Sequence, residues 1–200
     1  MHMKIDLITK RRCSWVPEDD LLLLRYHDEE WGVPVHDDQK LFEFLVLEGN
    51  QAGLSWPLIL RKRENFRIAF NQFNPKKIAL YTNNKVEELM QNSGIIRNRR
   101  KIEAVIINAQ AFIQTQEEFG SFDAFIWNFV DGKPIINHWK DANQIPSKTT
   151  LSTIISKELK KRGFKFVGPT TMYAHMQATG MVNDHLIQCF RHKEVLCHNS

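Results

Sequence analysis

Two pairs of side chains that can bind a metal lie near the two ends of this 200-residue chain. Cys13 and His27 form the first pair, and His185 and Cys189 form the second. Residues four apart on a helix share a face, so the second pair can point at one ion. Two thiolates and two imidazoles are typical of a tetrahedral zinc site, which would tie the N-terminal segment to the last helix.

The spacing of these residues leaves two alternatives open. The two pairs are remote in sequence, so they could be ordinary buried cysteines and surface histidines. Three residues near the C-terminus are rival ligands: His192, Cys197 and His198. The chain has 3 Cys and 8 His, which excludes a disulfide framework, so its thiols are free, metal-bound or catalytic.

Residues 47–56, with the sequence Leu-Glu-Gly-Asn-Gln-Ala-Gly-Leu-Ser-Trp, have the composition of a ligand pocket. Glu48 ends an apolar helix face, where a carboxylate is costly unless it is paired or used. The amide of Gln51 offers hydrogen bonds, small residues open space, and Trp56 offers a plane for stacking. Such a pocket suits a planar, nitrogen-rich ligand such as a nucleobase. The alternative is a helix C-terminus with glycine as its cap and tryptophan in the core.

Residues 160–171 combine basic side chains with a helix–turn–helix pattern. One predicted helix ends at Gly163, and the next begins at a Gly-Pro pair, whose free backbone N–H groups can hold a phosphate. The residues that would form this clamp on a DNA backbone are Lys160, Lys161, Lys165, Gly168 and Thr170. The alternative is an ordinary helix connection with a solvated basic face. The basic turn at 97–101 has the same two interpretations.

Helical periodicity dominates the segments that position these groups. Helices are predicted over residues 37–49, 56–73, 75–81, 84–92, 100–117, 149–162, 170–179 and 183–190. No long alternating pattern predicts a strand, and the acidic stretch before Tyr26 is predicted to be irregular. We expect an all-α protein with one domain over 13–190, made of two closely packed helical lobes, a flexible lead-in at 1–12 and a flexible tail at 191–200.

Composition narrows the class of protein further. The chain is 42% hydrophobic, enough for a sizeable core. Its apolar runs are far shorter than the roughly 20 residues that cross a bilayer, and no secretory signal follows the N-terminus. The formal net charge of +4 permits an anionic partner without requiring one. We expect a monomeric, cytoplasmic protein with no membrane partner.

In content and order, these residues resemble the DNA-3-methyladenine glycosylase I family. The shared motifs are Cys13-x-Trp15, Tyr26-His27-Asp28-x-Glu30-Trp31-Gly32-Val33-Pro34, residues 47–56, Gly94-Ile95-Ile96-Arg97, residues 160–168 and Val182-Asn183-Asp184-His185. The resemblance implies a helix-hairpin-helix glycosylase that acts on alkylated double-stranded DNA. Such an enzyme flips out 3-methyladenine, hydrolyses its N-glycosidic bond and leaves an abasic site and the free base.

The resemblance also implies roles for single residues. The ligands of one structural zinc ion per chain would be Cys13, His27, His185 and Cys189. Glu48 would read the base, within a pocket that includes Tyr26, Trp31, Gln51 and Trp56. Asp184 would either stabilise the sugar cation or orient the neighbouring His185, and we favour the second role. The chain departs from the family at Leu23, where a tyrosine is frequent.

Two functions from other classes stay open. A zinc-stabilised, non-catalytic DNA-binding module would need Glu48 and Trp56 to be core residues. A zinc hydrolase or deaminase would pair His-x-Glu with Pro-Cys-x-x-Cys, which this sequence lacks. Four protein ligands would also close the metal site and leave the ion without a catalytic position.

Overall fold

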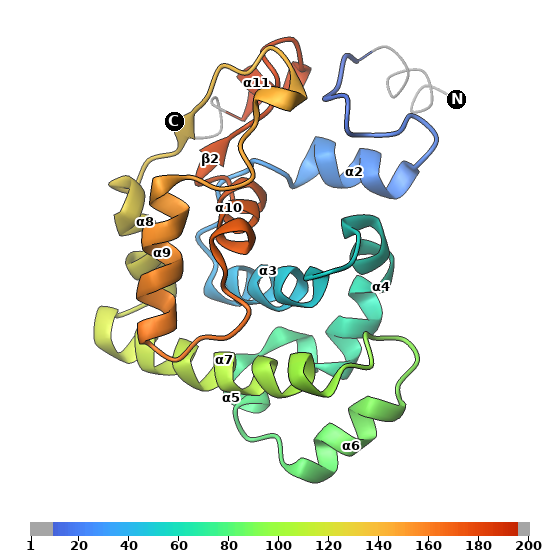
Figure 1. The fold of residues 1–200 in the computed structure, drawn as a ribbon, viewed down its shortest axis with the longest axis vertical. Helices are drawn as coiled ribbons and strands as arrows, with labels where there is room; N and C mark the ends of the chain where they lie inside the picture. Colours follow the sequence, from blue (N-terminus) through green and yellow to red (C-terminus); the bar gives the residue numbers. More distant parts are fainter. Residues whose placement is uncertain (1–9, 196–200) are drawn as a thin grey trace.

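The computed structural model describes residues 10–195, and its regular structure is almost entirely helical (Figure 1). The helices are α2 (Leu21–Glu29), α3 (Asp38–Gln51), α4 (Trp56–Ala69), α5 (Pro75–Ile78), α6 (Asn83–Gln91), α7 (Arg99–Phe119), α8 (Phe122–Trp127), α9 (Thr150–Lys161), α10 (Pro169–Ala178) and α11 (Phe190–Glu194). Single 3-10 turns are η1 (Asn71–Phe73), η2 (Asn128–Val130) and η3 (Ala142–Gln144). The all-α prediction is confirmed for the described residues.

Capping residues explain where several helices begin. The side chain of Asp37 accepts a hydrogen bond from the backbone N of Lys40, which fixes the start of α3. Thr149 and Ser152 form a reciprocal capping box at the start of α9. Gly168 precedes α10, whose first turn contains proline. These starts agree with the sequence-based boundaries because capping is a local interaction.

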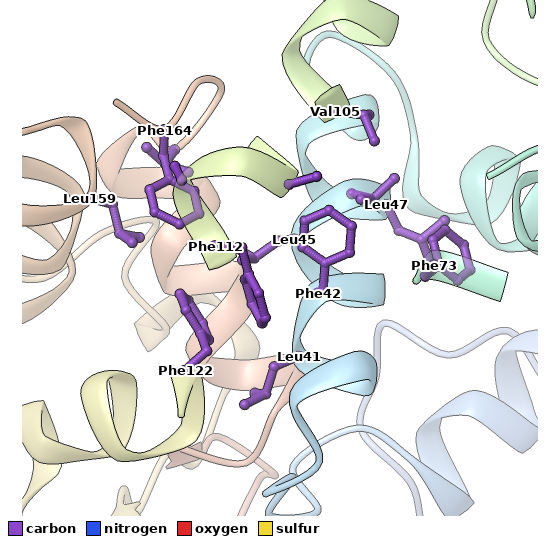
Figure 2. Close-up of a cluster of buried hydrophobic side chains, with 14 of the residues drawn as sticks. Leu41, Phe42, Leu45, Leu47, Phe73, Val105, Phe112, Phe122, Leu159 and Phe164 are labelled. Atoms are coloured by element: carbon purple, nitrogen blue, oxygen red, sulfur yellow. The ribbon is translucent and has the colours of Figure 1, made fainter. Parts of the chain in front are cut away.

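Helix α3 lies at the centre of the fold, between α10 and α7 (Figure 1). Every residue of α3 from Leu41 to Asn50 is buried. Phe42 packs edge-on against Phe112 of α7, with ring centroids 5.0 Å apart, and Phe112 stacks on Phe122 of α8 at 4.3 Å. Figure 2 shows these rings in the main core cluster, with side chains from α7, α8 and α9 gathered around α3. Because α3 is covered on all sides, polar groups on it must be paired or used.

A second cluster of buried residues joins the two ends of the chain. It contains Cys13, Val16, Leu23, Leu24, Tyr26, Trp31, Phe44, Leu60, Ala178, Leu186 and Cys189. The short strands β1 (Ile135–Ile136) and β2 (Val182–Asn183) pair in parallel, with Ile135 opposite Val182. This pairing fixes the segment before His185 against the loop that follows α8.

Two local predictions are wrong. The stretch predicted to be irregular contains α2, because Asp20 caps the backbone N of Leu22 and of Leu23, and the four consecutive leucines hide the helical period. The predicted helix at 183–190 is absent, because Val182–Asn183 is a strand and the following residues form a turn closed by the Cys189 N to Leu186 O hydrogen bond of 2.7 Å.

The flexible ends also need correction where the structure describes them. Residues of the predicted tail form α11, and Arg191 and His192 within it are buried. Residues 196–200, and 1–9 of the predicted lead-in, lie outside the described residues. Arg12 of the lead-in is held by an ion pair of 2.7 Å to Asp28. Arg12 and residues 191–194 of α11 therefore have defined contacts or structure outside the range 13–190.

Candidate functional site

Cys13, His27, His185 and Cys189 meet in one buried cluster, and their ligand atoms all lie within 4.8 Å of one another. The Nδ1 atom of His185 is 3.7 Å from the Sγ of Cys13 and 3.6 Å from the Sγ of Cys189. The Cys189 Sγ also lies 3.5 Å from the Nε2 of His27. Sulfur and nitrogen ligands of a tetrahedral zinc ion are about 3.5 Å apart, given bonds of about 2.3 and 2.0 Å. The donor set therefore fits zinc in kind and in spacing.

Partners outside the cluster orient both imidazole rings. The Nδ1 atom of His27 lies 2.7 Å from Asp28 Oδ1, and the Nε2 atom of His185 lies 2.9 Å from the Trp31 carbonyl oxygen. These contacts leave His27 Nε2 and His185 Nδ1 facing the two thiols, as in metal sites that fix their histidines through the second nitrogen. Asp28 belongs to a recognised motif, but its role as the carboxylate partner was not foreseen.

The two thiols of the cluster share a proton. Their hydrogen bond raises the pKa of Cys13 and lowers the pKa of Cys189, which the rings of His185 and His27 lower further. Burial lowers the pKa of His185 and keeps its ring neutral. Thiolate and neutral imidazole are the forms that bind a metal. With four protein ligands, a metal ion here would have no open coordination position.

The cluster forms by a route that the sequence did not predict. His185 and Cys189 converge through a turn, since no helix covers these two residues, and Cys189 is the N-cap of α11. The rival His192 places its Nε2 atom 2.8 Å from the Asn137 carbonyl oxygen, away from the cluster. Cys197 and His198 lie outside the described residues.

A cavity of about 400 Å³ opens beside the cluster, between α2, α3, α10 and the start of α4. Its lining comprises Trp15, Tyr26, Trp31, Glu48, Gln51, Trp56, Ala142, Ile145, Pro146, Ala174, Gln177 and Ala178. The rings of Tyr26 and Trp56 lie 5.3 Å apart, and those of Trp15 and Trp31 lie 5.1 Å apart. All five predicted pocket residues thus line one aromatic cavity.

Glu48 is the one carboxylate in this cavity lining, and it is only 3% exposed. Its Oε2 atom lies 2.9 Å from the Nδ1 atom of His175, whereas its Oε1 atom and the Nε1 atom of Trp56 have no partner among the described residues. Burial raises the pKa of Glu48, and His175 opposes that rise. One acceptor and one donor therefore remain unused in a buried cavity, which is where a polar ligand can pair with them.

Two residues of α10 were missed by sequence reasoning. Gln177 lines the cavity, and His175 contacts Glu48 without lining the cavity; nothing in the local pattern of the predicted helix marks either residue. Trp15 was part of a motif without an assigned role. Leu23, the departure from the family pattern, is 4% exposed in the second cluster and does not line the cavity.

Asp184 makes contacts other than the expected one with the His185 ring. Its carboxylate is 1% exposed and accepts four hydrogen bonds, from Asn137 Nδ2, Trp139 Nε1, Tyr173 Oη and Gln177 Nε2, at 2.6 to 2.8 Å. The predicted contact with the His185 ring is absent among the described residues, because that ring bonds to the Trp31 carbonyl oxygen. Asp184 instead ties α10 to the loop after β1.

The basic segment forms a hairpin between two packed helices. Helix α9 ends at Lys161, and Gly163 adopts a φ of +92°, which favours glycine, as the chain turns toward α10. Phe164 and Val167 are buried, whereas the basic side chains and the first turn of α10 are accessible. The exposed candidates are Lys160, Lys161, Lys165 and Thr170, and Gly168 is half-buried.

Within the basic turn at 97–101, Lys101 has a structural position. Its Nζ atom donates hydrogen bonds of 2.7 Å to the carbonyl oxygens of Asn50 and Ala52. These acceptors lie at the C-terminal end of α3, next to Gln51 and the cavity. Lys101 therefore caps the C-terminal end of α3, whereas Arg97 and Arg100 are exposed.

Comparisons with known proteins agree with this geometry. The family described as methyladenine glycosylase matches residues 15–192. The chain is 52% identical over 178 residues to the DNA-3-methyladenine glycosylase of Haemophilus influenzae, covering 89% of this chain and 96% of that protein. No helix of the described residues is long and apolar enough to cross a membrane.

Solved structures are similar over nearly the whole fold. A crystal structure of 3-methyladenine DNA glycosylase I has a TM-score of 0.88 and 52% identity, covering 90% of this chain and 98% of that one. A tyrosine-to-phenylalanine variant of a 3-methyladenine DNA glycosylase I, in complex with 3-methyladenine, has a TM-score of 0.87 and 37% identity, with coverage of 90% and 96%.

Proposed function

The chain belongs to the methyladenine glycosylase family, and we propose that it excises 3-methyladenine from alkylated double-stranded DNA. It is a hydrolytic glycosylase, so the products are the free base and an abasic site. We assign the aromatic cavity around Glu48 as the place where the flipped base is held.

The enzyme needs to do little to activate the leaving base. An adenine methylated at N3 carries a positive charge, which weakens its bond to deoxyribose. When the bond between C1′ and N9 breaks, its electron pair goes to the base, which leaves neutral, and the positive charge passes to the sugar. Water adds to C1′ and releases a proton. The enzyme must therefore extrude the nucleotide, hold the base and admit water.

The observation that carries the assignment is the unpaired Oε1 of Glu48 in an aromatic cavity. An ionised Glu48 would accept a hydrogen bond from the exocyclic amine of adenine and would favour a cationic base over a neutral one. Trp56 and Tyr26 would stack on the ring. A contact between an aromatic ring and a cation contributes about 0.5–2 kcal/mol, so shape and hydrogen bonding must supply the remaining selectivity.

The hairpin between α9 and α10 would hold the DNA backbone. The backbone N–H groups at the start of α10 have no side-chain cap and would bind a phosphate of the DNA. The Gly-Pro pair at this start and the neighbouring positive charge support that contact. The residues proposed for this contact are Lys160, Lys161, Lys165, Gly168 and Thr170. This helix-hairpin-helix clamp is separate from the base cavity, so the two can be tested independently.

Zinc would have a structural role. One ion per chain, bound by Cys13, His27, His185 and Cys189, would join the N-terminal segment to the C-terminal segment. We propose that Asp184 is also structural, since its carboxylate is buried and already accepts four hydrogen bonds. The enzyme is proposed to act as a monomer in the cytoplasm.

Release of free base from DNA tests the proposal. DNA alkylated with a labelled methyl donor is incubated with the wild-type protein and with Glu48→Gln, and the free 3-methyladenine is separated and counted. We expect release by the wild type and strongly reduced release by the variant. Binding of the DNA without release of any base would instead support the non-catalytic DNA-binding module.

A further inference from the structure

The contact between Glu48, which lines the cavity, and His175 joins α3 to α10. His175 lies on α10, is 1% exposed and is 127 residues from Glu48 in sequence. The two atoms left over in this pair, Glu48 Oε1 and His175 Nε2, are buried and have no partner among the described residues. The contact therefore engages one atom of each group and leaves the other unpaired.

The unpaired Nε2 atom restricts where the protons of this pair reside. If both His175 nitrogens were protonated, Nε2–H would be a buried donor without an acceptor. If Glu48 were protonated and donated to Nδ1, the ring proton would be on Nε2, and Nε2–H would again be a buried donor without an acceptor. If Nδ1–H donates to an ionised Glu48, Nε2 is a bare acceptor and no buried donor of the pair is unsatisfied. The third arrangement leaves no donor of the pair unpaired, and its cost is a buried carboxylate charge that a cationic ligand would compensate.

We propose that His175 is a positioning residue for Glu48, with a neutral ring protonated on Nδ1. The Nδ1–H group holds Oε2 and leaves Oε1 as the single free acceptor for the methylated base. Because the ring is neutral, the pair carries one uncompensated negative charge, which selects for a cationic base. This inference rests on the proposed role of Glu48.

Nitrogen-15 magnetic resonance of labelled histidine tests the protonation state directly. At about pH 7, the wild-type protein should show a neutral-ring signal with its proton on Nδ1 that vanishes in His175→Asn, while the corresponding signals of the other histidines remain. A His175 signal typical of the imidazolium, or of the tautomer protonated on Nε2, would overturn the proposal.

Two variants of His175 test the positioning role by calorimetry with free 3-methyladenine. His175→Phe removes the donor, so affinity should fall about ten- to a hundredfold, as for a hydrogen bond to a charged group. His175→Asn places an amide N–H near the position of Nδ1 and should recover most of that loss. Melting curves confirm that each variant is folded. Wild-type affinity in His175→Phe, or no recovery in a folded His175→Asn, would contradict the proposal.

Two controls separate this inference from the proposed function. His36→Phe removes a histidine–carboxylate contact on the surface, where His36 Nδ1 lies 2.8 Å from Asp123 Oδ1, and it should leave base affinity unchanged. If Glu48→Gln binds 3-methyladenine as well as the wild type, the role of Glu48 fails and the inference fails with it. If Glu48→Gln weakens binding and His175→Phe does not, the inference alone is wrong.

Discussion

The Nε2 atom of His27 lies 3.5 Å from the Sγ atom of Cys189, although 162 residues separate the two in sequence. A metal ion bound between them would close a loop that contains nearly the whole domain. Closing a long loop restricts the unfolded chain more than closing a short one, and the free energy of metal binding adds to that of folding.

The first prediction concerns this metal. The isolated protein should contain about one zinc ion per chain, measured by elemental analysis. Cys189→Ser should lose the ion and lower the melting temperature, without changing base selectivity in the folded fraction. Cys197→Ser is the matched control and should keep the ion. Stoichiometric zinc in the Cys13→Ser, His185→Ala double variant would rule out this ligand set.

The second prediction concerns the hairpin clamp. Changing Lys160, Lys161 and Lys165 to Glu should weaken DNA binding and flatten its salt dependence, because fewer counterions are released. Affinity for free 3-methyladenine should stay the same. A control with equal change in net charge converts three exposed lysines elsewhere, Lys76, Lys77 and Lys133, and should weaken DNA binding much less. If base and DNA affinity fall together, the hairpin is not a separate phosphate site.

The third prediction concerns the cavity. Glu48→Gln should lower affinity for free 3-methyladenine about ten- to a hundredfold, because a hydrogen bond to a charged group contributes roughly 1.5–3 kcal/mol. Trp56→Ala should remove about 1–3 kcal/mol of stacking and weaken all purines alike. Calorimetry with a set of purines therefore distinguishes a change in selectivity from a general loss. Collapse of both melting temperatures, with affinity per folded molecule unchanged, would show that these residues are only core.

The fourth prediction separates structure from DNA contact in the turn at 97–101. Lys101→Met leaves the carbonyl oxygens of Asn50 and Ala52 without their donor, so the free energy of unfolding should fall by about 1–3 kcal/mol. The salt dependence of DNA binding should not change. Arg100→Met, at an exposed position, is the control and should leave stability nearly unaltered. A flatter salt dependence in Lys101→Met alone would mean that this lysine contacts DNA.

The fifth prediction concerns the ion pairs that Arg63 makes with Glu30 and Glu43. Arg63 donates to both carboxylate oxygens of Glu30, at 2.8 Å each, and to Glu43 at 2.6 Å. Burial opposes the charge of both carboxyls, but the bonds from Arg63 outweigh it and lower their pKa values. The pairs stabilise the fold fully above the ordinary pKa of 4.5, and that contribution is lost as the pH falls below it.

Denaturant titrations at several pH values test this network. Arg63→Met should lower the free energy of unfolding by about 1–3 kcal/mol near neutral pH, because Glu30 and Glu43 lose their bonds from Arg63 but keep ion pairs to Lys40 and, for Glu43, to Arg67. The difference from the wild type should shrink in acid. Arg61→Met, which removes a more exposed ion pair to Asp20, should lose at most about 1 kcal/mol. A difference that grows in acid would mean that the carboxyls are not the source of the effect.

The sequence by itself determined features that depend on neighbouring residues. Asp37 and Thr149 mark helix starts because a cap acts within three residues of itself. Glu48, Gln51 and Trp56 were recognised as pocket residues because they are close together in the chain, at the end of α3 and the start of α4. Motif order was sufficient to identify the family.

Only the tertiary structure decided contacts between distant segments. The turn that brings His185 to Cys189 depends on β2 pairing with β1, and no local periodicity encodes that pairing. The sequence favoured a contact between Asp184 and the adjacent His185, but the Asp184 carboxylate accepts hydrogen bonds from α10 and from the loop after β1. No sequence pattern marked His175 as a functional residue, because its proposed role depends on its contact with Glu48, 127 residues away. Helical propensity acts over one turn of chain, whereas these partners are selected by the packing of whole helices.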